Sequence, residues 1–135
     1  MSEITGRSAL RAARGVLAVG LFAVGLWYGA YWMQGYTPRR EWLRLAMRSE
    51  PFHVAAHLVL YGALYALCRA LLRAWGTAGV ALSIVITLAV ALAQETVQVV
   101  TYRRQFAGGE AFDIAVDCVA IAIVSVILRR RAQKK

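Results

Sequence analysis

Four long, nearly uncharged runs of residues constrain the fold of this chain more than any other feature. A helix needs about 20 apolar residues to cross a bilayer, with about 17–25 tolerated, and each run has that length. Hydrophobic residues make up 60% of the 135 residues, whereas soluble domains have about 45–50%. We therefore predict an all-α membrane protein consisting of one integral membrane domain, residues 1–135. The predicted transmembrane helices lie at about residues 15–36, 52–70, 75–97 and 111–128.

The basic residues predict the orientation of these helices. The formal net charge is +9, but the lysines and arginines flank the apolar runs, which is typical of membrane proteins and disfavours nucleic-acid binding. With four spans, ten of the sixteen basic residues lie on the side that carries the N-terminal segment, the second loop and the C-terminal tail. The positive-inside rule then predicts cytoplasmic termini. We expect a multi-pass protein of the bacterial inner (plasma) membrane.

The loop between the first and second predicted helices has the pattern of a short interfacial helix. Thr37 and Pro38 suit a helix start, and Trp42 and Leu45 follow at helical spacing. Arginines form another stripe of the same segment, and two interpretations of them stay open. They contact lipid headgroups, or they bind an anionic ligand such as a lipid-linked phosphate. Including the loop before the last helix, the predicted anion- or headgroup-binding residues are Arg39, Arg40, Arg103 and Arg104.

Polar and ionisable side chains gather at one end of the last three predicted helices. His53, His57 and Tyr61 are four residues apart, so they share one stripe of the second helix. At a rise of about 1.5 Å per residue, the polar groups of the three helices lie at comparable depth, in the outer third of the bilayer. The predicted polar pocket consists of His57, Tyr61, Glu95, Gln98, Asp113 and Asp117.

Two interpretations of this polar cluster remain open. Ionised carboxylates in hydrocarbon have to face the bundle and find partners, so the cluster could be a clamp that holds the helices in register. The alternative, which we favour, is a functional pocket open to the outer leaflet, because this is the default for ionisable residues inside a membrane. His57, Arg103 and Arg104 are the available partners of the carboxylates.

Metal binding and catalysis find less support in the sequence. His53 and His57, with Glu95 or Asp117, have a spacing that could ligate zinc, but an HExxH motif is absent and basic neighbours oppose a cation. Serines and threonines are few, and none lies at motif spacing from a histidine. We therefore predict no metal, no cofactor and no catalytic residue.

The order of the polar residues resembles that of the VanZ-like family of small bacterial membrane proteins. The resemblance spans roughly residues 53–127 and is carried by His57 and Tyr61 (His-x-x-x-Tyr), Glu95 and Gln98 (Glu-x-x-Gln), a loop arginine at Arg103 or Arg104, and Asp113 at the start of the last helix. The chain departs from the family at Asp117, where Asn is usual, and at Ala120, where Gly is usual. Because the family is named for a protein associated with teicoplanin resistance, the resemblance implies a role in the cell envelope and in glycopeptide tolerance.

These observations lead to two functional hypotheses from different classes. In the first, the outer-leaflet pocket binds a membrane lipid, either anionic or polyprenyl-linked, such as an envelope precursor. In the second, the chain is an accessory or assembly subunit packed against a larger membrane protein complex. Gly25 and Gly29 at GxxxG spacing agree with the second hypothesis. An enzyme acting on lipid phosphates, with His57 as acid or base, ranks last because no phosphatase or transferase motif accompanies the histidine.

Overall fold

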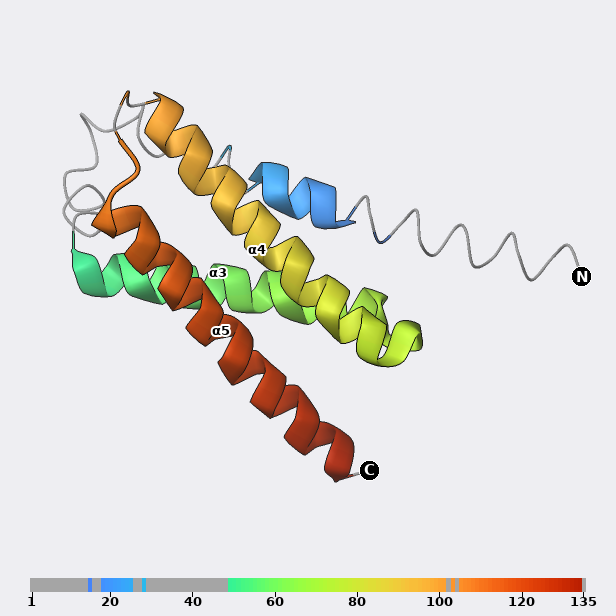
Figure 1. The fold of residues 1–135 in the computed structure, drawn as a ribbon. Helices are drawn as coiled ribbons and strands as arrows, with labels where there is room; N and C mark the ends of the chain where they lie inside the picture. Colours follow the sequence, from blue (N-terminus) through green and yellow to red (C-terminus); the bar gives the residue numbers. More distant parts are fainter. Residues whose placement is uncertain are drawn as a thin grey trace, which may run out of the picture.

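The computed structural model describes residues 15, 18–25, 28, 49–101, 103 and 105–134, and every regular element in this part of the chain is a helix. The elements follow in the order α3 (Glu50–Leu71), the 3-10 helix η2 (Arg73–Trp75), α4 (Gly76–Thr101) and α5 (Gly108–Gln133). Figure 1 shows the three long helices crossing one another, with η2 in the connection between α3 and α4.

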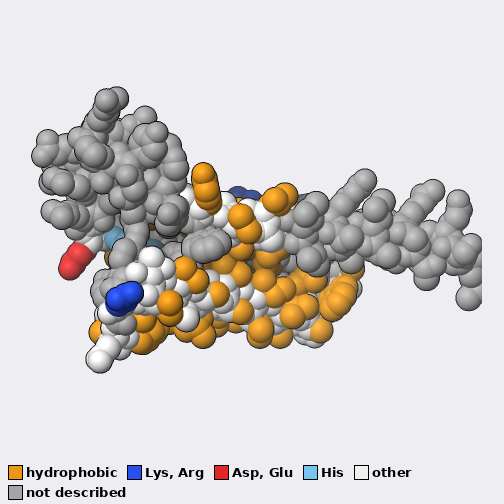
Figure 2. Space-filling view, turned by 90° about the horizontal axis from the view of Figure 1, so that it is seen from above, with side chains coloured by type: hydrophobic (Ala, Val, Ile, Leu, Met, Phe, Trp, Pro, Cys, Tyr) orange, Lys and Arg blue, Asp and Glu red, His pale blue; other side chains and the backbone are white. Residues whose placement is uncertain are grey.

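Three of the described helices are long and apolar enough to cross a membrane. With 22 residues in α3 and 26 each in α4 and α5, their lengths are roughly 33–39 Å, against about 30 Å for the hydrocarbon core. Large apolar side chains are exposed along them, among them Val59, Val85 and Val119. Figure 2 shows this apolar surface along the helices, whereas the acidic and histidine side chains in view lie together at one end. The second, third and fourth predicted spans are therefore confirmed as membrane-length helices.

The first predicted span lies only partly within the described residues. Residues 18–25 are helical, and Val19 and Phe22 pack against buried side chains of α3 and α4. Gly25 is exposed and has open space beside it. Gly15 and Tyr28 are also described, whereas the other residues of the span 15–36, Gly29 included, and the predicted interfacial helix after Pro38 lie outside the described residues.

The start of α3 follows from three consecutive residues. Ser49 is the N-cap, with an extended backbone, and its hydroxyl accepts a hydrogen bond from the amide of Phe52 at 3.4 Å. Glu50 places a negative charge in the first turn, and Pro51 occupies a position where no helical amide donor is needed. The helix therefore starts two residues before the predicted span.

The connection between α3 and α4 is tight and depends on two glycines. Gly76 has a φ of +56°, a left-handed conformation that glycine adopts without steric cost. Gly79 faces the carbonyl oxygen of Leu72 so closely that a Cβ atom would overlap it. Because the chain reverses within η2, α4 runs antiparallel to α3 and packs directly against it.

The packed face of α4 is a stripe of residues spaced by four. Its members are all buried and mostly small: Gly79, Ser83, Thr87, Ala91 and Glu95. The hydroxyls of Ser83 and Thr87 donate to backbone carbonyls four residues earlier, at 2.6 and 2.8 Å, so they need no partner on another helix. Small residues allow close approach of helices in a membrane. The stripe ends at the buried carboxylate of Glu95.

Helices α3 and α5 run parallel with a constant offset of 60 residues. The side-chain pairs His53–Asp113, His57–Asp117 and Tyr65–Ser125 all join residues separated by 60. Between His57 and Tyr65, Gly62 lies against α5, where an added Cβ would come within 3.3 Å of Val124. This interface brings the N-terminal ends of α3 and α5 together with the C-terminal end of α4, and we call this end of the bundle the polar end.

Helix α5 begins at the polar end with a side-chain cap of its own. The amide of Ala107 donates to Oε2 of Glu110 at 2.9 Å, which closes the first turn. The helix therefore starts at Gly108, three residues before the predicted span. Its other end carries Arg130 and Arg131 in the last turn, where cations suit the helix dipole.

Candidate functional site

The centre of the polar end is a buried pair between α3 and α5. Nδ1 of His57 lies 2.9 Å from Oδ1 of Asp117, and the two side chains are 6% and 0% exposed. Since an ionised carboxylate has no proton to donate, the imidazole donates through its Nδ1–H. In the neutral imidazole, this hydrogen bond leaves Nε2 of His57 as the nitrogen with a free lone pair.

A second histidine–aspartate pair lies one helical turn closer to the end of the bundle. Nε2 of His53 lies 3.1 Å from Oδ2 of Asp113, with the side chains 39% and 15% exposed. The rings of His53 and His57 are 4.6 Å apart between centroids. We call these four residues, His53, His57, Asp113 and Asp117, the His–Asp cluster.

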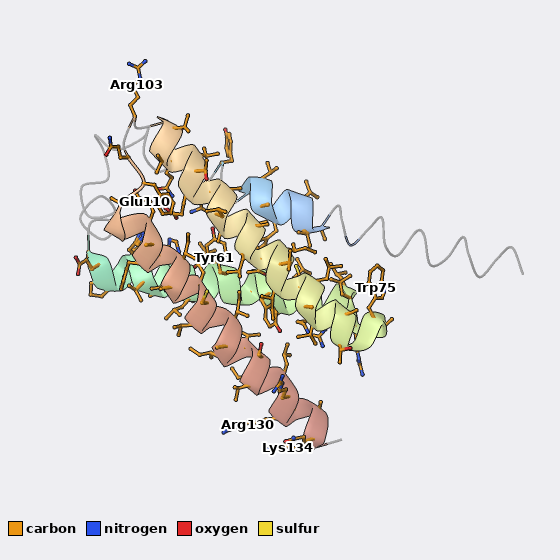
Figure 3. All side chains as sticks on the ribbon, in the orientation of Figure 1. Tyr61, Trp75, Arg103, Glu110, Arg130 and Lys134 are labelled. Carbon is orange, nitrogen blue, oxygen red and sulfur yellow. The ribbon has the colours of Figure 1, made fainter. Side chains whose placement is uncertain are left out.

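Tyr61 joins the His–Asp cluster to α4. Its hydroxyl donates to Oε1 of Gln94 at 2.8 Å, and its ring lies 5.4 Å from that of His57 between centroids. Figure 3 shows Tyr61 on α3 in the interior of the bundle. Gln98, which the sequence suggested as the amide of the pocket, lies one turn beyond Gln94 and is half-buried, so the hydrogen bond to Tyr61 is made by Gln94 instead.

Glu95 contributes a further buried carboxylate to the polar end. The residue is 2% exposed, and Oε1 has no hydrogen-bond partner among the described residues. Its charge interacts with those of His57, Asp113 and Asp117. Oδ2 of Asp117 is likewise buried and without a hydrogen-bond partner in the described part of the chain. The cluster therefore has polar atoms to spare for a group beyond its own side chains.

The predicted arginines do not complete this cluster within the described residues. Arg103 is exposed in the connection between α4 and α5, with a φ of +50°, and Figure 3 shows its side chain directed away from the helices. Arg39, Arg40 and Arg104 lie outside the described residues. Of the partners proposed for the carboxylates, the structure therefore shows the histidine pairing with Asp117.

A cleft opens beside the outermost pair. It has a volume of about 450 Å³ and lies between the N-terminal ends of α3 and α5. Its walls are apolar at Val54 and Phe112, and polar or charged at Ser49, Glu50, His53 and Asp113. The cleft therefore combines an apolar wall with direct access to the His–Asp cluster.

Sequence reasoning left two partners out of the predicted pocket. His53 belonged to the recognised stripe of α3 but not to the pocket, and Gln94 was passed over in favour of Gln98. One signal was available for His53, because the spacing of four between the histidines equals that between Asp113 and Asp117. On two parallel helices, two histidines and two aspartates with the same spacing can form two His–Asp pairs. The choice between Gln94 and Gln98 depends on the rotation of α4, which no local pattern reveals.

Comparisons with known proteins add no assignment. The sequence matches no protein-family model, and neither the curated proteins nor the solved structures give a significant match.

Proposed function

We propose that this chain is a VanZ-like protein of the bacterial inner membrane whose polar end binds a membrane lipid, such as an anionic or polyprenyl-linked envelope precursor. The proposal includes four spans with both termini in the cytoplasm. The distribution of basic residues supports this topology, because the C-terminal end of α5 carries Arg129, Arg130 and Arg131 and lies opposite the polar end. In this orientation the polar end faces the outer leaflet.

The cleft between α3 and α5 is the observation that carries the proposal. Amphiphilic ligands need an apolar wall for the chain and polar groups for the head, and pockets of about 300–1,000 Å³ are usual for small ligands. Val54 and Phe112 supply the wall, while His53 and Asp113 lie where a headgroup would rest.

In this proposal the arginines of the two loops at the polar end draw an anionic headgroup to the cleft. Arg103 is exposed, as a residue with that role has to be. Arg39, Arg40 and Arg104 are assigned the same role from their place in the sequence.

Native mass spectrometry tests the lipid proposal directly. The full chain is first reconstituted in bilayers that contain phosphatidylglycerol and a polyprenyl phosphate. It is then extracted into detergent, and the micelles are removed in the mass spectrometer. We expect one retained lipid per chain, lost in Val54→Trp, which fills the cleft. The matched control is Val119→Trp on the exposed apolar face of α5, which should retain the lipid.

Two outcomes would contradict lipid binding in the cleft. Equal lipid retention by Val54→Trp and Val119→Trp would place the lipid on the general apolar surface. Recovery of a stoichiometric protein partner from native membranes, with no lipid bound, would favour the accessory-subunit hypothesis and leave the polar end as a clamp between helices.

An effect on glycopeptide tolerance that disappears in Val54→Trp would connect the cleft to the envelope.

A further inference from the structure

We infer that His53, His57 and Asp113 form a binding site for one divalent transition-metal ion of the Zn²⁺ type at the polar end. This goes beyond lipid binding, since it concerns the His–Asp cluster at the inner side of the cleft and requires no lipid. It also departs from the expectation from sequence, which predicted no metal because basic residues lie nearby. Among those basic residues, the structure describes Arg103, and its side chain is directed away from the helices (Figure 3).

The positions of the three donor groups carry the inference. One donor atom from each of His53, His57 and Asp113 lies within 4.8 Å of the other two. Zinc–nitrogen and zinc–oxygen distances of about 2.0–2.2 Å place the ligand atoms of a tetrahedral site roughly 3.4 Å apart. The separation of 3.1 Å between His53 and Asp113 is already close to this value. Small side-chain rotations therefore bring all three donors into coordination distance.

The backbone supports the same geometry. The two histidines are one turn apart on α3, so both project from the same face. Asp113 comes from the parallel helix α5 and reaches the outer histidine from the side. Two imidazoles and one carboxylate from two packed helices form the set of three protein ligands that leaves further coordination positions open, as in catalytic zinc and non-haem iron sites.

Asp117 supplies the outer-shell contact that metal-binding histidines have. A ligating histidine almost always donates its second nitrogen to a carboxylate or carbonyl, which orients the ring and raises its basicity. The hydrogen bond from Nδ1 of His57 to Asp117 does this, and it leaves Nε2 for the metal. The interaction that fixes the helix interface therefore also selects the correct tautomer.

Unsatisfied buried oxygens provide the second, independent observation. Oδ2 of Asp117 and Oε1 of Glu95 are buried and have no hydrogen-bond partner in the described residues. Together with Asp113, three carboxylates interact around His57. Buried charges of one sign are costly unless a counter-charge is present. A divalent cation held by His53, His57 and Asp113 supplies that charge close to them, and the water it carries can donate to the unsatisfied oxygens.

The donor types and the access route define the class of ion. Imidazole and carboxylate donors suit zinc, iron and related divalent ions, whereas a site for magnesium or calcium consists of oxygen ligands alone. His53 and Asp113 also line the cleft, so an ion can enter from it without unfolding the bundle. A coordination position on the cleft side is left for water or for a ligand oxygen.

Zinc titration of the full chain tests the site. The protein is purified in detergent, freed of affinity tag and metal, and dialysed against buffered Zn²⁺ before metal analysis. We expect one zinc per chain and an increase in the thermal midpoint, neither of which Mg²⁺ produces. X-ray absorption of the loaded protein should show about two imidazole ligands at about 2.0–2.1 Å.

Variants separate coordination from folding. His53→Asn and Asp113→Asn alter the more exposed of the two pairs, so both variants should fold as the unmodified protein does and lose stoichiometric zinc. Asp117→Asn should weaken zinc binding by about 10–100-fold, as outer-shell changes do. Ser125→Ala, which removes another contact of the same helix interface, should bind zinc unchanged.

Two results would overturn the inference. One is a tag-free chain that takes up no zinc, and the other is a zinc stoichiometry that His53→Asn and Asp113→Asn leave unchanged. Because the measurement uses the metal alone in detergent, it is independent of lipid binding in the cleft. A chain that binds zinc but no lipid keeps the metal site and rejects the proposed function.

Discussion

Nδ1 of His57 lies 2.9 Å from Oδ1 of Asp117 in the interface between α3 and α5, where both side chains are buried away from solvent. A buried pair of this kind loses most when a single partner is removed, because the remaining group keeps its desolvation cost without compensation. This single contact therefore joins the stability of the bundle to the chemistry of the polar end.

Removal of one partner of this pair should be strongly destabilising. We expect His57→Ala to lower the free energy of unfolding by about 3–5 kcal/mol, because it leaves Asp117 buried and alone. Asp113→Ala should cost less, since the pair that it belongs to is partly exposed. Unfolding in mixed detergent micelles measures both variants. Equal costs would show that burial of the pair contributes little.

The tyrosine–glutamine contact should be worth less than the His57–Asp117 pair. Tyr61→Phe removes the donor to Gln94, and hydrogen bonds between membrane helices contribute about 0.6 kcal/mol on average, up to about 1.7. A double-mutant cycle with Gln94→Leu isolates the contact. A coupling energy of zero would mean that the hydrogen bond adds no stability. Tyr65→Phe, at the contact with Ser125, is the matched control at another tyrosine of α3.

Close packing at Gly62 should be sensitive to side-chain volume. A Cβ at this position would come within 3.3 Å of Val124, so Gly62→Ala requires only a small shift. Gly62→Leu should separate α3 from α5 and lower stability by about 1–3 kcal/mol, the range for overpacked cores. The exposed neighbour Ala63→Leu serves as control and should be neutral. Comparable losses in both leucine variants would contradict the packing described at Gly62.

Cysteine labelling should report the proposed topology. In a chain whose Cys68 and Cys118 are replaced by alanine, Gly108→Cys lies at the polar end and Gln133→Cys at the other end of α5. A membrane-impermeant maleimide is added to cells whose inner membrane is intact and whose outer membrane or cell wall has been removed. It should label Gly108→Cys and not Gln133→Cys. The opposite pattern would invert the proposed orientation.

Helix positions were predictable from the sequence because each depends on local composition. The predicted spans 52–70, 75–97 and 111–128 correspond to α3, α4 and α5, which extend further by up to five residues except at the start of α4, one residue later than predicted. The extensions at α3 and α5 follow from the caps at Ser49 and Glu110, where polar residues continue a helix beyond its apolar run. Hydropathy marks the apolar run and not the cap.

Side-chain partners were less predictable because they depend on how the helices are rotated and aligned. The sequence placed His57 and Asp117 in one cluster, and the structure pairs them. It favoured Gln98 over Gln94 and left His53 out of the pocket, since both assignments need the angle at which α4 and α5 face α3. The small-residue stripe ending at Glu95, which the sequence analysis did not identify, marks the face of α4 that packs but not the side chains that this face meets.

The equal spacing of the two histidines and the two aspartates has a mechanical consequence. If α5 slid along α3 by one turn, about 5.4 Å, one histidine would meet the other aspartate, so one pair would re-form while one was lost. The two His–Asp pairs alone therefore permit two registers of α5 along α3. The contacts of Gly62 with Val124 and of Tyr65 with Ser125 do not repeat at this spacing. These contacts select a single register of the two helices.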